Sequence, residues 1–142
     1  MKGFTITELL VVMAIAIILW SLSTMVLIRP QVKANLDAAV DALTADIKSQ
    51  QTKAMSGDGS LDYGVHFDAD AYTLTPQNYA VEMDSPISFT NITFAGGNLV
   101  FANGSGEVVG FALGQNSLTV TNSAGGNSTN LTINQYGAIE KN

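Results

Sequence analysis

The chain divides near residue 56 into two parts with different hydrophobic patterns. The first part contains an apolar run from Leu9 to Ile28, in which two serines and one threonine are the only polar residues. Twenty residues of helix, at about 1.5 Å each, span about 30 Å, which matches the hydrocarbon core of a membrane. The run therefore predicts a membrane-spanning helix, and Arg29 follows it directly.

After Pro30 the pattern becomes that of an amphipathic helix, with apolar residues at three- and four-residue steps. The apolar positions are Val32, Leu36, Ala39, Val40, Leu43, Ile47, Ala54 and Met55. We expect a kink at Pro30 rather than a helix end, because the helical periodicity resumes at once. A glycine-rich stretch then ends the helix near Met55. One bent helix is expected, with the apolar stripe of its outer half packed on a sheet.

From Leu61 onward the pattern is that of short strands, because β-branched and aromatic residues alternate with polar ones between Gly, Asn and Asp. The predicted strands are 62–67, 71–75, 79–83, 87–94, 98–101, 107–113, 117–121, 130–134 and 138–140, and the predicted hairpin turns are 68–70, 95–98 and 103–106. Closely spaced short strands favour an antiparallel sheet over βαβ units, and no second helix is expected. The predicted fold class is α+β, a long N-terminal helix packed on an antiparallel β-sheet domain.

Composition and charge narrow the classes of function. The 142 residues are enough for one domain with a core, and 46% of them are hydrophobic. Lys and Arg number 6 against 12 Asp and Glu, which disfavours nucleic acid as a partner because phosphate binding needs clustered basic residues. The chain has no cysteine, so the domain must fold without disulfides.

The residues around the apolar run argue against two simple interpretations of this segment, a secretory signal peptide and a plain membrane anchor. A secretory signal is disfavoured, because a single Lys precedes the run, the run exceeds the usual ~7–15 residues, and no small-x-small cleavage site follows. A plain membrane anchor is disfavoured by Glu8, since a carboxylate near the membrane interior is costly and is retained mostly where it has a partner.

The chain resembles type IV pilins and the pseudopilins of type II secretion in the segment Gly3-Phe4-Thr5-Ile6-Thr7-Glu8-Leu9-Leu10-Val11-Val12. In that family a prepilin peptidase cuts after the Gly that ends a short basic leader, and the new N-terminal residue is N-methylated. The resemblance implies cleavage between Gly3 and Phe4 and N-methylation of Phe4. It implies the pilin fold, with a leader at 1–3, a transmembrane and assembly half of the helix at 4–29, an amphipathic half at 30–56 and a β-domain at 57–142.

The same resemblance implies an assembly role for Glu8, which stands where the family carries its glutamate. Glu8 would pair with the amine of Phe4, either in a neighbouring subunit or in its own chain. In a helix bundle of low dielectric constant an unpaired carboxylate is costly, so this pairing would favour one axial register over slipped ones.

The β-part resembles GspH/FimT-type pseudopilins and minor pilins in Leu99-Val100-Phe101-Ala102-Asn103-Gly104 and in Leu131-Thr132-Ile133-Asn134-Gln135-Tyr136-Gly137-Ala138-Ile139. The implied function is a structural subunit, a minor pilin or pseudopilin, of a type IV pilus or type II secretion filament. A major pilin of a thin pilus and a filament-displayed adhesin or binding module remain alternatives. DNA binding through C-terminal basic residues, found in some relatives, is not carried over because Lys141 is the only basic residue after Lys53.

The resemblance also implies the partners and the location of the chain. The partners are other pilin or pseudopilin subunits, a prepilin peptidase, an inner-membrane assembly platform and the membrane itself. The precursor would cross the inner membrane once, and a cytoplasmic ATPase would drive its extraction into an extracellular or periplasmic filament.

Candidate catalytic and metal-binding residues are few. His66 is the only histidine and there is no cysteine, so nucleophilic catalysis lacks its parts, and we expect neither an enzyme nor a cofactor. Asp58, Asp62, Asp68 and Asp70 are candidate calcium ligands around two turns. They lack EF-hand spacing, and turn-forming and solvating roles are favoured for them, so no metal site is expected.

Overall fold

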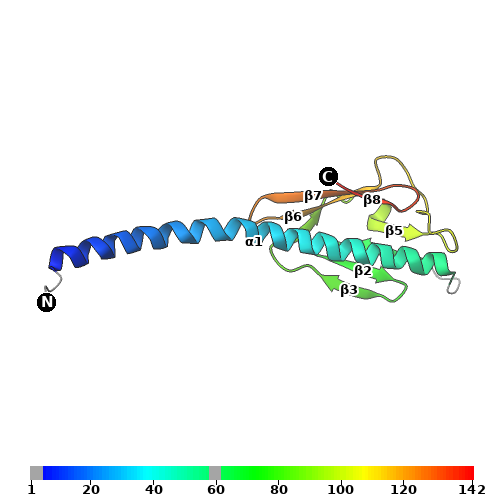
Figure 1. Cartoon of the computed structure of the whole chain (residues 1–142). Coiled ribbons are helices and arrows are strands. Elements are labelled where there is room, and N and C mark those ends of the chain that lie inside the picture. Colours follow the sequence, from blue (N-terminus) through cyan, green and yellow to red (C-terminus); the bar gives the residue numbers. More distant parts are fainter. Residues whose placement is uncertain (1–4, 58–61) are drawn as a thin grey trace.

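The computed structural model describes residues 5–57 and 62–142, without the side chains of residues 22–30. These residues form an α+β structure in which the N-terminal half of a long helix projects from a β-domain (Figure 1). The elements are α1 (Ile6–Ser56), β1 (Tyr63–Phe67), β2 (Ala71–Thr75), β3 (Tyr79–Glu82), β4 (Ile87–Thr90), the 3-10 turn η1 (Ala95–Gly97), β5 (Asn98–Phe101), β6 (Ser117–Asn122), β7 (Asn127–Ile133) and β8 (Ile139–Lys141).

The helix α1 is continuous over 51 residues. It continues through Pro30 and does not end there, which confirms that part of the prediction. The predicted kink depends on the Pro30 ring, which lies outside the described side chains. The helix ends one residue beyond Met55, at Ser56. Gly57 closes it with a φ of 66°, a left-handed conformation that glycine adopts without strain, and donates its N–H to the carbonyl of Ala54.

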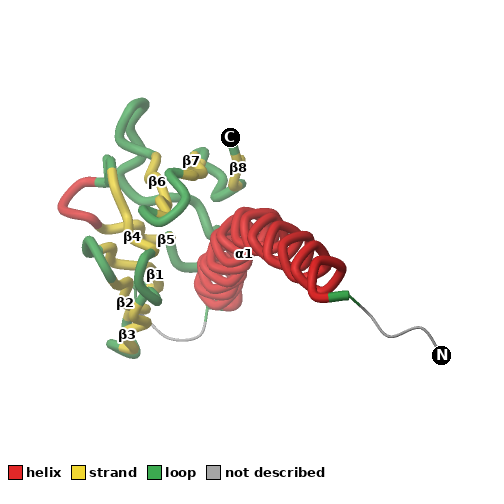
Figure 2. Tube along the Cα trace, turned by 90° about the vertical axis from the view of Figure 1, so that its left-hand side faces the viewer, coloured by secondary structure: helices red, strands yellow, loops and turns green. Residues whose placement is uncertain are grey.

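The strands form two antiparallel sheets rather than one. Their orders are β3-β2-β1-β5 and β4-β6-β7-β8, and both sheets lie on the same side of α1 (Figure 2). The predicted hairpin at residues 95–98 is therefore wrong. This segment forms η1 and carries the chain from β4 in one sheet to β5 in the other. The predicted turn at 68–70 does connect a hairpin, because β1 and β2 pair directly.

Each described strand coincides with a predicted one, but two predictions fail in part. The predicted strand at 87–94 stops at Thr90. Asn91 has a φ of 50°, and a strand cannot continue through a left-handed residue. At the other end of the chain, β7 begins at Asn127, earlier than predicted.

The predicted strand at 107–113 is wrong. Within this segment Val108 forms a single bridge to Phe101, and no strand follows it. Gly106 and Gly110 have φ values of 70° and 67°, which break the pleat despite the alternation of apolar residues between them. Residues 102–116 thus form a long irregular loop. Its first turn, at 103–106, was predicted to join a hairpin but is followed only by the Val108 bridge.

The core is one cluster built from the inner faces of both sheets and the outer half of α1. The helix contributes Leu36, Val40, Leu43, Ile47 and Ala54, which the three- and four-residue steps place on one side. The strands and loops contribute Tyr63, Val65, Phe67, Tyr72, Ile87, Phe89, Phe94, Leu99, Phe101, Leu118, Val120, Leu131 and Ile133. The predicted packing of the apolar stripe is confirmed, except that Met55 is exposed.

Polar contacts also hold the outer half of α1 to the domain, and two of them involve Tyr72 and Gln51. The Tyr72 hydroxyl donates to an Asp46 carboxylate oxygen at 2.5 Å. The Gln51 amide nitrogen donates to the carbonyls of Gly106 at 3.0 Å and Tyr136 at 2.8 Å. The first contact joins α1 to β2 and the second joins it to two loops, so together they limit sliding and rotation of the helix on the sheets.

Candidate assembly site in the projecting helix

The helix begins with a capped first turn. Thr5 has an extended backbone, and the N–H of Glu8 donates to both its carbonyl oxygen at 3.1 Å and its hydroxyl oxygen at 3.4 Å. This satisfies one of the backbone donors that every helix start leaves free. The sequence Thr-x-x-Glu is the signature of a capping box. This local signal marks the helix start at Thr5 independently of the apolar run that follows it.

The Glu8 side chain lies in this first turn, where a negative charge is stabilised by the helix dipole. It is exposed, and within the described residues its carboxylate makes no hydrogen bond or ion pair. The local cap therefore uses the backbone N–H of Glu8 and leaves the charged group available to another partner. Its predicted partner, Phe4, lies outside the described residues together with Gly3, so the structure does not place the cleavage site or the pairing.

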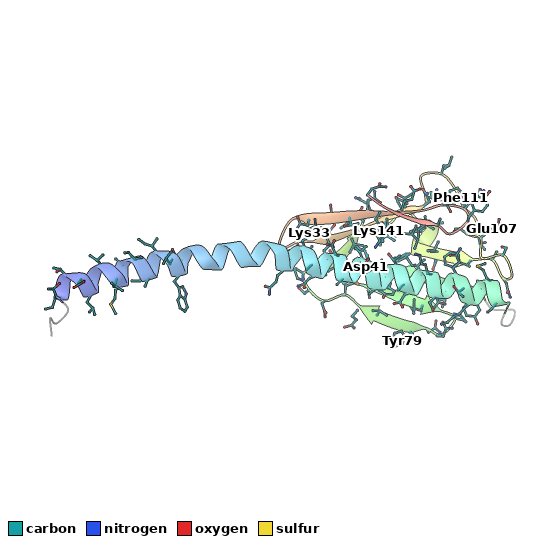
Figure 3. All side chains as sticks on the ribbon, in the orientation of Figure 1. Lys33, Asp41, Tyr79, Glu107, Phe111 and Lys141 are labelled. Atoms are coloured by element: carbon teal, nitrogen blue, oxygen red, sulfur yellow. The ribbon has the colours of Figure 1, made fainter. Side chains whose placement is uncertain are left out.

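The described part of the first half of α1, up to Trp20, leaves its large apolar side chains exposed. Figure 3 shows the side chains standing off this half, which the domain does not cover. The exposed large apolar residues are Ile6, Leu9, Leu10, Val11, Val12, Met13, Ile15, Ile17, Ile18, Leu19 and Trp20. Trp20 is 78% exposed and does not pack against the described part of its own chain.

This exposure has a large energetic consequence. Burying a side chain of this size contributes about 1.5–3 kcal/mol, so covering the whole set contributes on the order of 20 kcal/mol. That exceeds the net stability of a typical domain, about 5–15 kcal/mol. This apolar surface is therefore available to a lipid or protein partner, and covering it would be strongly favourable.

The described part of α1 contains no stretch that is both long and apolar enough to cross a membrane. The side chains of residues 22–30, which include the last part of the predicted span, lie outside the described residues. A membrane-spanning half at 4–29 thus stays a prediction.

The candidate calcium ligands do not converge. Among the described residues, no three His, Cys, Asp or Glu side chains come together in an arrangement that could hold a metal ion. Asp68 lies 3.5 Å from Nε2 of His66, and Asp70 lines a groove beside the connection from β3 to β4. Asp62 is exposed at the start of β1, and Asp58 lies outside the described residues.

His66 lies among residues that give it a structural environment. It is half-buried in β1, and its Nδ1 lies 2.9 Å from the amide oxygen of Asn98 on the neighbouring strand β5. These contacts join two strands of one sheet. No nucleophile or second imidazole stands beside it among the described residues, so the arrangement favours a structural role.

Comparison with known protein families, with curated proteins and with solved structures found no match to this chain.

Proposed function

We propose that this chain is a non-enzymatic filament subunit of the type IV pilin and pseudopilin class, with the pilin fold. The observation that carries the proposal is that the two halves of one continuous helix have different surroundings. The outer half forms the core of a folded domain, and the inner half presents an uncovered apolar surface. An apolar helix rigidly attached to a domain can exchange lipid contacts for contacts with other copies of itself.

The position of Glu8 supports the same proposal. A single carboxylate, which has no partner among the described residues, stands at the start of the apolar half, and no other charge follows in the sequence before Arg29. When such helices bundle, an unpaired buried carboxylate costs several kcal/mol, and pairing with the amine of Phe4 offsets much of that cost. Pairing would therefore select one axial register among the copies.

The deciding experiment is mass spectrometry of filaments sheared from native cells, with the N-terminal peptide and its abundance recorded. An abundant peptide that begins at methylated Phe4 makes the chain a major subunit. A trace of the same peptide beside a more abundant pilin makes it a minor subunit. The proposal fails if the chain stays in the membrane fraction with residues 1–3 attached. That result would favour the interpretation of this segment as a plain membrane anchor.

Substitution of Glu8 tests the assembly step separately from membrane insertion. The variant Glu8→Ala is expected to insert normally and to assemble poorly, because the register-setting charge is lost. Asp37→Ala is the matched control, because Asp37 is another exposed carboxylate of α1 but lies outside the apolar half. A normal yield of filaments from Glu8→Ala would contradict the assigned role.

A second candidate function, a filament-displayed binding module, is favoured by the loop at 102–116. Loops of this length without regular structure are often functional. Figure 3 places its residues Glu107 and Phe111 at the end of the molecule farthest from the N-terminus. Leu113 in this loop is 89% exposed. If the loop binds a ligand, Leu113→Ser should leave filament yield unchanged and reduce attachment of the cells to their surface; unchanged attachment would exclude this loop.

A further inference from the structure

A groove runs along one side of α1 within the folded domain. It has a volume of about 390 Å³ and lies between the helix and the connection from β3 to β4. Its helix wall is made of small residues, Ala38, Ala39 and Ala42, and its opposite wall includes Met83 and Pro86. Such walls accept the methylene stem of a long side chain, provided that the charged end of that side chain finds a partner at the rim.

The rim of this groove carries negative charge. Glu82 and Asp84 line it and are exposed, and no lysine or arginine with a described side chain does. Neither carboxylate makes a hydrogen bond or ion pair with its side chain in the part of the chain that the structure describes. The groove is thus apolar along its walls and acidic at its edge, which suits a lysine or arginine side chain.

The opposite side of α1 carries one lysine of complementary charge, Lys33, beside Asp37 and the paired Asp41 and Lys141. At about 100° per residue, Ala42 of the groove and Lys33 point in opposite directions from the helix axis. Lys33 is exposed and has no ion pair among the described residues, whereas Lys141 nearby is already paired with Asp41. Figure 3 shows Lys33 and Lys141 on the side of α1 that faces β7 and β8, away from Tyr79 on β3.

We propose that neighbouring copies of this chain contact one another head to tail through these two sides of α1. Lys33 of one copy enters the groove of the next copy, with its stem along the alanines and its ammonium group between Glu82 and Asp84. The inference rests on the proposed function and adds to it a specific contact between folded domains.

Because the two surfaces differ, their contact does not close a dimer. Copies that bundle their apolar halves side by side all point in one direction, so each meets its neighbours through opposite sides of the helix. Contact between two different surfaces is heterologous, and it produces filaments or rings rather than closed dimers. Each copy offers one lysine and one groove, so every added subunit leaves a new lysine and a new groove available.

Cysteine cross-linking tests the contact directly, because the native chain has no cysteine. Filaments are prepared from the double variant Lys33→Cys with Asp84→Cys, treated with a short bifunctional maleimide that spans the gap left by the removed lysine stem, and separated under denaturing conditions. The expected result is a ladder of dimers, trimers and larger oligomers, since the contact repeats from copy to copy. A product that stops at the dimer would indicate a symmetric contact and overturn the proposal.

The matched control is the double variant Lys48→Cys with Asp84→Cys. Lys48 is an exposed lysine on the same side of α1 as Lys33, about 22 Å farther along the helix axis. Its variant should give no ladder. A ladder from Lys48→Cys without one from Lys33→Cys would overturn the assigned pairing.

A charge swap tests the electrostatic part without cross-linking. Lys33→Asp and Asp84→Lys are each expected to lower filament yield roughly tenfold, because each places like charges at the contact. The combined variant should recover most of the yield, and a combined variant as poor as either single one would overturn the proposal. Both positions are exposed, and unchanged thermal midpoints verify folding.

These outcomes are distinguishable from failure of the proposed function. If the wild-type chain forms no filaments with any pilin, the proposed function fails. If filaments form but neither the ladder nor the rescue by the charge swap is seen, only the proposed contact fails. If the double-cysteine variant does not assemble into filaments, the filament yield of the combined charge-swap variant decides whether the proposed contact exists.

Discussion

Gly137→Ala should break the hydrogen bonds by which Gln51 of α1 holds two loops of the domain. Gly137 has a φ of 76°, and a Cβ added there would lie 2.2 Å from the Gln51 amide nitrogen. That nitrogen donates to the carbonyls of Gly106 and Tyr136. Because the added methyl group and the amide cannot share this space, the Gln51 side chain must leave both carbonyls.

The expected loss has two parts. An alanine in the left-handed region costs about 1–2 kcal/mol. Each lost hydrogen bond adds about 0.5–1.5 kcal/mol. The free energy of unfolding should therefore fall by roughly 2–5 kcal/mol, most of a typical margin. Gly114→Ala is the matched control, because Gly114 has a φ of 83° and nothing within 4 Å of the added Cβ, so it should show the conformational part alone.

The assay is urea unfolding of the full chain in mild detergent, followed by near-ultraviolet circular dichroism. Gln51→Ala removes the hydrogen bonds and the steric conflict together. In that background Gly137→Ala should cost little more than Gly114→Ala does in the wild type. Equal losses for the two glycine variants, or strict additivity of Gly137→Ala with Gln51→Ala, would refute the reasoning.

Three further predictions concern the core, the pH dependence and the surface. Leu43→Ala should lower the free energy of unfolding by about 3 kcal/mol, because Leu43 is fully buried between helix and sheets; Leu113→Ala, at an exposed leucine, should change it by less than about 0.5 kcal/mol. Burial, and secondly its hydrogen bond to an aspartate, raise the pKa of Tyr72. The folded chain therefore keeps this proton where the unfolded chain loses it, so stability is intact below about pH 10 and falls as the pH rises further. Tyr72→Phe should make alkaline unfolding measurably less steep, and an unchanged profile would contradict this. Lys141→Met should cost less than about 1 kcal/mol, and high salt should abolish the difference, because its ion pair with Asp41 is exposed.

The local elements were largely predictable because they depend on neighbouring residues. The three- and four-residue steps from Leu36 to Ala54 predicted the buried side of the helix, and Gly57 predicted its end. Alternation predicted most strands for the same reason. It failed at 107–113, where apolar residues alternate but Gly106 and Gly110 adopt positive φ. Alternation records which residues prefer one face, whereas the backbone conformation of a glycine depends on what surrounds it.

The division into two sheets could not be predicted from these patterns. The pairing of β4 with β6 and of β5 with β1 joins segments that are distant in the sequence. The turn at Ala95–Gly97 resembles a hairpin turn locally, and only the pairing of its flanking strands shows that it connects two sheets. The groove beside α1 has the same origin, since its walls come from the helix and from a connection more than forty residues later.

By itself the sequence determined the long helix, the apolar character of its first half, the carboxylate at its start and the α+β class. These follow from periodicity and composition, which act over one or a few helical turns. The tertiary structure decided which carbonyls hold Gln51, which charges remain without partners, and that Lys33 and the acidic groove lie on opposite sides of one helix. Those relations depend on long-range packing, because distant segments must be brought together before their side chains define a surface.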